Sequence, residues 1–344
     1  MTTTIATANP LSLTTEEQLE SRYNNEIRAF WQQGQFSSFT GVDDVKIRYA
    51  QFSQANNPQC LVIVPGRSEG YLKYQELAYD ISRLGFDIYI IDHRGQGLSE
   101  RMLANKHKGY VNHFDDYSED LNTFVNDVVS KDCKKDVFLL AHSMGGAISA
   151  RYLQLYPGKI KAAVLASPMI AINSGGIPTW LASAIINTGD GLATLFGQDS
   201  WYFLGQGEFE QTPFEENQLM QSKARYKIFT DLYQQQTDLQ LGGVTYRWLN
   251  EALAVNENLF ADINKLNTPV QVLQAGDDTV VDNQAQFDFC AALNQSHEAS
   301  CPGGKPFVVA EARHEIFFET DALRQQGIEE VMRWFTEHGA SMTQ

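Results

Sequence analysis

The sequence predicts an α/β protein in which helices flank a mainly parallel sheet, and three observations carry this prediction. Short apolar segments that read as strands alternate with segments of helical periodicity, a pattern typical of parallel strands joined by right-handed crossovers. The alternation stops after Ser167 and Pro168 and resumes at Val270, so a helical insertion is expected to interrupt one sheet. A serine, Ser143, stands directly after the apolar strand at 137–141 and before the next helix.

The N-terminal part is predicted to contain a lead, a helix and a hairpin. Residues 1–13 are expected to be a disordered lead, since they have neither the basic start nor the apolar stretch of a signal peptide. A helix is expected from Thr14 to about Gln33, because a threonine cap and acidic first-turn residues favour a helix start. Strands at 36–40 and 45–52 then form the predicted hairpin.

The elements that follow divide the chain into a core and an insertion. Residues 14–168 and 263–344 are expected to form the core, and residues 169–262 a helical insertion. The further core strands are predicted at 60–64, 87–92, 137–141, 162–166, 270–274 and 307–310. The core helices are predicted at 71–84, 117–129, 146–155, 283–293 and 321–338.

Composition and charge narrow the classes of function. The 344 residues are 43% hydrophobic and 20% charged, as is usual for a globular enzyme, and the formal net charge is −16. Such an acidic chain is not expected to bind nucleic acid or to dock tightly on anionic membranes. No apolar segment is long enough to span a bilayer, so a cytoplasmic protein is expected, with transient contact at the inner membrane face left open.

The four cysteines show no metal-ligand spacing and no C-x-x-C pair, so no metal site is expected. Cys60 and Cys133 fall at or just before predicted core strands and are expected to be reduced packing residues. Cys290 and Cys301 flank a polar loop and could pair in an oxidising compartment.

The segment around Ser143 carries the strongest chemical signal. A serine between a strand and a helix is typical of a strained turn that exposes the hydroxyl above the helix N-terminus. Ala141, Gly145 and Gly146 are small, as the close backbone approach at such a turn requires, although alanine replaces the first glycine of the usual G-x-S-x-G pattern. A serine hydroxyl is a weak nucleophile, so a base and an acid that orients it must lie nearby.

The base is predicted to be His314. It follows the apolar strand at 307–310, and a loop at the carboxyl edge of a parallel sheet is where active sites of such folds assemble. His297, in a polar loop, and His338, near the end of the last helix, are the weaker alternatives.

The acid is expected directly after the strand at 270–274. Asp277 and Asp278 are both suitable, and spacing alone does not separate them. Asp282 precedes a helical segment and is expected to be its N-cap.

Two main-chain amides are expected to hold the oxyanion of a tetrahedral intermediate. One is the amide of Met144, directly after the nucleophile. The other should come from the loop after the strand at 60–64; since Pro65 has no N–H, Arg67 is favoured over Gly66.

Several motifs together resemble a known family. These are Asp92-His93-Arg94-Gly95-Gln96-Gly97-Leu98-Ser99, Ala141-His142-Ser143-Met144-Gly145-Gly146, Ala312-Arg313-His314, Pro65-Gly66-Arg67 and Phe39-Thr40-Gly41-Val42-Asp43-Asp44. They resemble the α/β-hydrolases of the monoacylglycerol lipase and bacterial lysophospholipase group, from about Phe36 to the C-terminus. The family's G-x-x-D pattern selects Asp278 as the acid. The sequence departs from the family at Pro65, where a histidine is usual.

The resemblance implies that the insertion is a cap over the serine, with apolar side chains lining an acyl-chain site. Trp180, Ile185 and Phe196 are the candidates for this lining, although most apolar residues of the insertion are expected to pack against one another. Arg225, in the one basic cluster of the insertion, is a candidate contact for a phosphate headgroup; a solvated helix face is the alternative.

The resemblance therefore predicts an α/β-hydrolase fold and a serine carboxylic-ester hydrolase. The expected substrate is a lysophospholipid, with monoacylglycerol second and acyl transfer as another outcome of the same chemistry. No cofactor is expected. A binding module without catalysis is disfavoured by the complete Ser143, Asp278 and His314 set.

Overall fold

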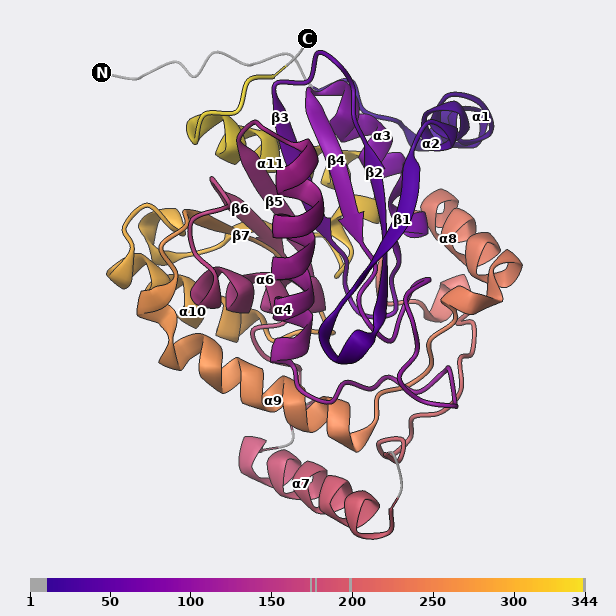
Figure 1. Ribbon diagram of the computed structural model, residues 1–344, viewed down its shortest axis with the longest axis vertical. Coiled ribbons are helices and arrows are strands. Elements are labelled where there is room, and N and C mark those ends of the chain that lie inside the picture. The colour runs from indigo at the N-terminus through magenta and orange to yellow at the C-terminus, as the bar shows by residue number, and fades with distance from the viewer. Residues whose placement is uncertain (1–10, 174, 177, 198–199, 343–344) are drawn as a thin grey trace.

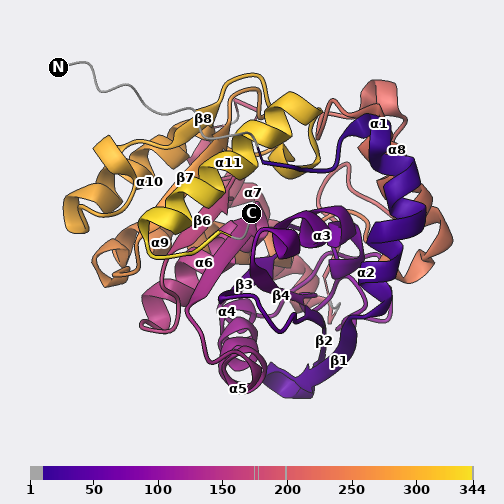
Figure 2. The ribbon, with the colours of Figure 1, turned by 90° about the horizontal axis from the view of Figure 1, so that it is seen from above.

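The computed structural model describes residues 11–173, 175–176, 178–197 and 200–342 and contains an eight-stranded sheet between two layers of helices (Figures 1 and 2). The strand order is β1-β2-β4-β3-β5-β6-β7-β8; β2 is antiparallel to β1 and β4, and the other pairs are parallel. The strands are β1 Gln35–Thr40, β2 Lys46–Phe52, β3 Gln59–Val64, β4 Phe86–Ile91, β5 Val137–His142, β6 Ala163–Ala166, β7 Val270–Ala275 and β8 Phe307–Val309. The predicted α/β class and mainly parallel sheet are confirmed.

The central strands are apolar along their length because both faces of the sheet are covered. Every residue of β3, β4 and β5 is buried, as expected for parallel strands between two helical layers. Helices α4 (Asp115–Thr123), α6 (Met144–Leu155) and α10 (Asn283–Ser296) share one apolar core with one face of the sheet. Helices α3 (Gln75–Arg83) and α11 (Asp321–Glu337) share the other core, and Figure 2 shows the two layers from above.

The N-terminal helix forms as predicted, whereas part of the predicted lead is ordered. Helix α1 (Glu16–Arg22) continues through a π-helical turn into α2 (Arg28–Gln32). Residues 1–10 lie outside the described residues. Leu13 is buried and Leu11 packs against the same core, so the expectation of disorder is wrong for residues 11–13, which their leucines hold in place.

We call the chain between β6 and β7 the β6–β7 insertion, and its described residues contain three longer helices. They are α7 (Thr179–Leu195), α8 (Lys223–Gln235) and α9 (Tyr246–Ala261). Helix α9 packs on α6 of the main body and α7 packs on α9, so that α7 forms the outer tip in Figure 1. Helix α8 lies apart from α7, beside α1.

All four cysteines form disulfides, one of them against expectation. Cys290 pairs with Cys301, as considered from the sequence, and Cys60 pairs with Cys133. Because β3 and β5 are neighbouring strands, the start of β3 lies beside the segment that leads into β5, and the two Cα atoms are 6.5 Å apart. The prediction that Cys60 and Cys133 are reduced is wrong. Disulfides persist mainly in oxidising compartments, which weighs against the expected cytoplasmic location.

Candidate active site

Ser143 occupies a strained turn between β5 and α6. Its backbone has φ +52° and ψ −119°, a conformation that residues other than glycine rarely adopt. A Cβ at Gly145 would lie 2.3 Å from the Val64 carbonyl oxygen, so only glycine lets the new helix pass this close to β3. The Ser143 amide donates to the Ala166 carbonyl at 2.9 Å, which fixes the turn to the adjacent strand.

The structure brings Ser143, His314 and Asp278 together in one hydrogen-bonded row. His314 Nε2 lies 2.9 Å from Ser143 Oγ, and Nδ1 lies 2.7 Å from Asp278 Oδ2. Because a carboxylate only accepts, Nδ1 donates to Asp278 and Nε2 is left to accept the serine proton. Burial raises the pKa of Asp278, but His314 and the amides of Val280 and Val281 outweigh it and hold the pKa below its ordinary value.

The alternatives raised by the sequence lie elsewhere. His297 ends α10 and contacts Ser300, and His338 ends α11. The Asp277 amide pairs with a carbonyl of the β8–α11 loop, and its carboxylate is not the one bound to the histidine. Asp282 accepts from two amides of the first turn of α10, which confirms the predicted N-cap.

Met144 and Arg67 carry the two main-chain amides that the sequence predicts as oxyanion donors. Within the described ranges neither amide donates to a protein acceptor. The Gly66 amide, in contrast, donates to Glu69 Oε2 at 2.5 Å and is not free. Pro65 has no N–H, so Arg67 is the remaining donor of this loop.

Glu69 organises the loop that carries Arg67. Besides the Gly66 amide, its carboxylate accepts from Lys73 Nζ at 2.7 Å and from the Tyr74 hydroxyl at 2.6 Å. Lys73 also pairs at 2.6 Å with Glu315, the residue after the catalytic-base candidate. All of these side chains are buried, so the network fixes two active-site loops to each other.

His142 joins the same network from the nucleophile turn. Its Nδ1 lies 3.3 Å from the Glu69 carboxylate, and its Nε2 lies 3.1 Å from the His314 carbonyl oxygen. Both neighbours are acceptors, so both ring nitrogens donate. Burial lowers the pKa of His142, but Glu69 and Glu315 outweigh it, and the pKa is raised. Sequence reasoning missed this role of Glu69, although it lies only three residues after Gly66.

Asp92 and His93 lie directly after β4 and support the active-site loops. His93 Nε2 donates to the Pro65 carbonyl at 3.0 Å, and Asp92 accepts from the amides of Tyr71 and Leu98. Burial lowers the pKa of His93 to about 4 and raises the pKa of Asp92 to about 7. His93 is thus neutral at neutral pH, and Asp92 binds its proton at a higher pH than an ordinary carboxyl does, which bears on the pH dependence of folding.

The predicted acyl-lining residues lie on or beside α7. Trp180 is 73% exposed, and Phe196 is 65% exposed and stacks on Trp201. Ile185 is half-buried and lines a shallow pocket of about 420 Å³ with Leu192, Trp201 and other residues of α7 and α9. The exposed tip of the insertion is therefore strongly apolar.

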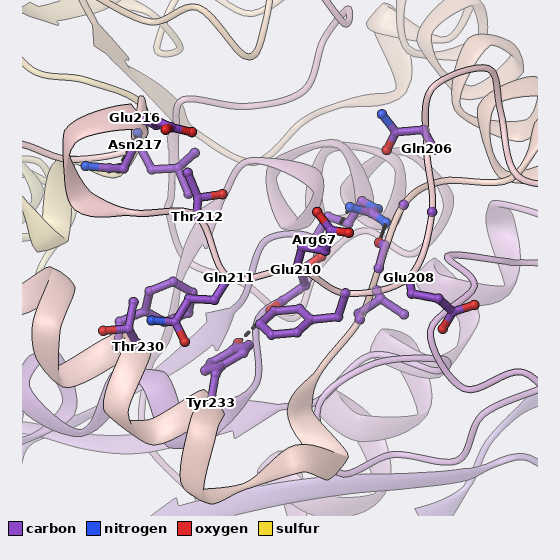
Figure 3. A pocket seen from close by; sticks show the side chains of 18 of the residues that line it. Arg67, Gln206, Glu208, Glu210, Gln211, Thr212, Glu216, Asn217, Thr230 and Tyr233 are labelled. Carbon is purple, nitrogen blue, oxygen red and sulfur yellow. Dashed lines mark hydrogen bonds between the residues drawn. The ribbon is translucent and has the colours of Figure 1, made fainter.

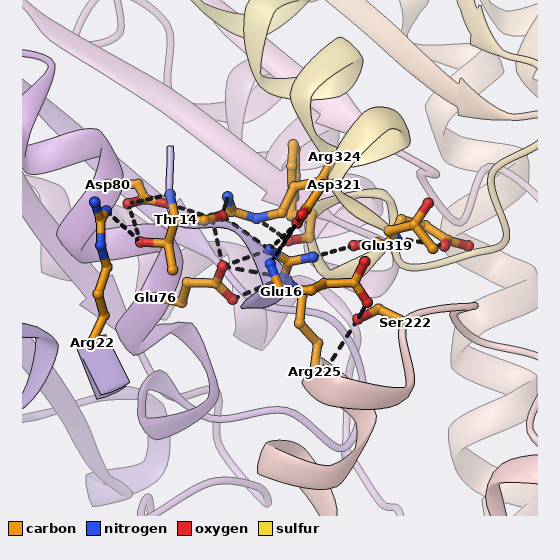
Figure 4. A network of polar contacts seen from close by, with 12 residues as sticks. Thr14, Glu16, Arg22, Glu76, Asp80, Ser222, Arg225, Glu319, Asp321 and Arg324 are labelled. Carbon is orange, nitrogen blue, oxygen red and sulfur yellow. Dashed lines mark hydrogen bonds and ion pairs between the residues drawn. The ribbon is translucent and has the colours of Figure 1, made fainter. Parts of the chain in front are cut away.

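Arg225 is not available to bind a headgroup, and this expectation is corrected. Its guanidinium is bound to Glu76, to Asp321 and to the carbonyl oxygens of Thr14 and Glu319, with nitrogen–oxygen distances of 2.7–3.1 Å (Figure 4). Only 3% of the residue is exposed. The sequence showed a basic cluster, but not the carboxylates that the fold brings to it.

A larger pocket lies between the Arg67 loop and the β6–β7 insertion (Figure 3). Its volume is about 720 Å³, and it is lined by Arg67 and Ser68 from the loop and by polar and aromatic residues from the insertion. No group of three or more His, Cys, Asp or Glu side chains in the described parts of the chain is placed to hold a metal ion.

Comparisons with known proteins agree with this fold. The family described as "Serine aminopeptidase, S33" matches residues 55–321. Lysophospholipase L2 of Escherichia coli (strain K12) is 39% identical over 311 residues, or 90% of each chain. Probable lysophospholipase L2 of Haemophilus influenzae is 31% identical over 308 residues, covering 89% of this chain and 93% of that protein. A solved monoglyceride lipase from Saccharomyces cerevisiae has a TM-score of 0.64 at 19% identity, covering 89% and 96% of the two chains.

The family match covers most of the chain, and the bacterial relatives align over nearly their whole length. The structural likeness shows the α/β-hydrolase fold. The chain is therefore a carboxylic-ester hydrolase of the α/β-hydrolase superfamily and belongs to its bacterial lysophospholipase and monoacylglycerol lipase-like group.

Proposed function

We propose that the protein releases a fatty acid from a lysophospholipid through an acyl-enzyme formed on Ser143. The observation that carries the proposal is the hydrogen-bonded row of Ser143, His314 and Asp278. The two bacterial relatives named lysophospholipase L2 support the choice of substrate class.

The geometry supports the following reaction. Ser143 Oγ attacks the ester carbonyl carbon while His314 Nε2 takes the hydroxyl proton, and the amides of Met144 and Arg67 hold the oxyanion. Collapse of the intermediate breaks the ester bond, and His314 gives the proton to the leaving alcohol. Water then attacks the acyl-enzyme by the same steps and restores the serine. Asp278 holds the imidazole in the required tautomer and stabilises its cation.

Monoacylglycerol is the second candidate substrate, because its ester can be attacked by the same groups and relatives named monoacylglycerol lipase match part of the chain. An acceptor alcohol in place of water would make the same acyl-enzyme a transferase. A lipid acceptor added to the assay separates these outcomes, because transfer yields a diacyl product.

We further propose that the β6–β7 insertion is the cap and that its tip touches the lipid surface transiently. The exposed apolar side chains of α7 support this contact, since amphipathic helices with aromatic residues bind at membrane interfaces. In the described parts of the chain no helix is both long and apolar enough to cross a bilayer. A vesicle flotation assay with Trp180→Ser tests the contact, and unchanged flotation would contradict it.

The test of the proposed function is fatty-acid release from lysophosphatidylcholine and monoacylglycerol of the same chain length. Ser143→Ala is expected to lower kcat by about 10⁴-fold or more. Ser149→Ala is the matched control on α6, the helix that follows Ser143, because its buried hydroxyl contacts no polar partner in the described residues. Turnover that survives Ser143→Ala in a folded protein would disprove the proposal.

A further inference from the structure

The side chain of Arg67 has unusual surroundings for a guanidinium below the protein surface. Its Nη2 donates to the Gly242 carbonyl at 2.5 Å and its Nη1 to Ser68 Oγ at 3.1 Å, and the group lies 5.5 Å from the centre of the Trp248 ring. The Nε hydrogen is buried and meets no acceptor among the described residues. Arg67 forms no ion pair within these residues either.

This lack of a carboxylate distinguishes the half-buried Arg67 from fully buried arginines of the chain. Arg94, Arg225 and Arg324 each bind at least one carboxylate at 2.7–3.1 Å. Burial without such a partner is unfavourable, and it lowers the pKa of Arg67 to about 10. The cation therefore has unused capacity to bind an anion from outside the chain.

The surrounding backbone leaves room for the guanidinium beside the pocket of Figure 3. A Cβ at Gly109 would lie 2.7 Å from Arg67 Nη2, so only glycine permits this position of the side chain. Arg67 also lines the 720 Å³ pocket, together with Gly242 of the insertion. The cation thus lies at the wall of a space large enough for a small polar group.

We propose that this pocket binds the phosphodiester headgroup of the substrate and that the Arg67 guanidinium holds its phosphate. The proposal rests on the proposed lysophospholipase function and names the group of the substrate that the pocket recognises. The Arg67 amide is the oxyanion donor in the reaction proposed above, and only the glycerol carbons separate the ester of a lysophospholipid from its phosphate. One residue can therefore contact both ends of this short span.

The other charges of the pocket specify the kind of headgroup. Glu208, Glu210 and Glu216 line the same pocket as Arg67, and Figure 3 shows their side chains around it. A zwitterionic headgroup, with a phosphate and an amine or quaternary ammonium, matches both signs of charge. A headgroup with additional negative charge meets repulsion from these carboxylates.

The test compares kcat/KM for lysophosphatidylcholine with kcat/KM for monoacylglycerol of the same acyl chain. Arg67→Met keeps the main-chain amide and most of the side-chain volume, and it is expected to lower the ratio of the two values at least tenfold, because a hydrogen bond to a charged group is lost. Lys227→Met is the matched control, since it removes an exposed cation from α8, and the ratio should stay within twofold. An equal loss on both substrates would show that Arg67 only supports the loop and would overturn the proposal.

A second measurement does not depend on lysophospholipid turnover. Glycerophosphocholine is expected to inhibit wild-type hydrolysis of p-nitrophenyl butyrate competitively, whereas glycerol at the same concentration should not. Arg67→Met should weaken this inhibition at least tenfold. Equal inhibition by inorganic phosphate, or none by glycerophosphocholine, would overturn the headgroup site. If the site binds glycerophosphocholine but lysophosphatidylcholine is not hydrolysed, the proposed function fails and the binding site stands.

Discussion

Arg225 is buried and Arg67 is half-buried beside a pocket, and the surroundings of the two guanidinium groups are opposite (Figures 4 and 3). Arg225 binds the carboxylates of Glu76 in α3 and Asp321 in α11, and the carbonyl oxygens of Thr14 before α1 and Glu319 before α11. Arg67 binds one carbonyl oxygen and one hydroxyl and has a buried N–H without an acceptor in the described residues. The role of a basic residue therefore depends on its partners. A guanidinium paired with carboxylates stabilises the fold, whereas one with an N–H that has no acceptor can bind a ligand.

The largest effect on stability is expected from Arg225→Met. The change leaves Glu76 buried with a weaker cation contact, and breaking a buried pair on one side costs about 3–5 kcal/mol. Urea denaturation measures the free energy of unfolding. Lys227→Met on the same helix breaks only the exposed pair with Asp231 and should change stability little. If both variants lost the same free energy of unfolding, the buried contacts of Arg225 would be no more stabilising than an exposed ion pair, which would contradict the prediction.

A smaller loss, about 2–3 kcal/mol, is expected from Glu69→Gln, which removes the buried charge between Lys73 and His142. Because Glu69 positions the loop that carries the Arg67 amide, kcat should fall about tenfold on either substrate while KM changes less. Steady-state kinetics checks this split. A change confined to KM would assign Glu69 to substrate binding instead.

His93→Gln is expected to alter the change in stability between pH 6.5 and pH 4 by about 2.5 kcal/mol. The pKa of His93 is about 4 in the folded protein and near 6.5 when unfolded, so the unfolded chain binds the extra proton between these values. Wild type should therefore lose stability relative to the variant as pH falls from about 6.5 to about 4. Denaturation curves at several pH values measure the gap, and parallel profiles would contradict the buried neutral state. Asp92 is common to both proteins and cancels.

The smallest change is expected from Arg67→Met, which should alter the free energy of unfolding by less than about 1 kcal/mol. No ion pair is broken, and the unfavourable burial of the cation is relieved. The same denaturation series as for Arg225→Met provides the comparison. A loss as large as that of Arg225→Met would mean that Arg67 is a structural cation as well.

The features that depend on residues adjacent in the sequence could be predicted from the sequence. The strand before Ser143 and the helix after it define the turn, and the strand ends before Asp278 and His314 place both at one edge of the sheet. Choosing Asp278 over Asp277 required the family pattern, because adjacent residues share the same spacing. Met144 was predicted as a main-chain donor because it follows Ser143, and Arg67 because Pro65 has no N–H. The role of both amides stays a prediction.

Contacts between distant residues were not predictable in this way. Arg225 meets Glu76 and Asp321, which lie 149 and 96 positions away, and no local pattern links them. The Cys60–Cys133 disulfide spans 73 residues and depends on β3 lying beside β5. Periodicity identifies the apolar face of a helix, but it does not indicate which charged residues from distant parts of the chain will pair with the helix.

The Arg225 network also limits how the insertion can move. Through Arg225 and Ser222, α8 is attached to α3, to α11 and to Glu16 at the start of α1, whereas α7 packs on α9 at the tip. A rigid swing of the whole insertion would break every one of these buried bonds together. An opening that preserves these contacts must bend the chain between α7 and α8. The apolar tip at α7 would then move while α8 stays attached to α1, α3 and α11.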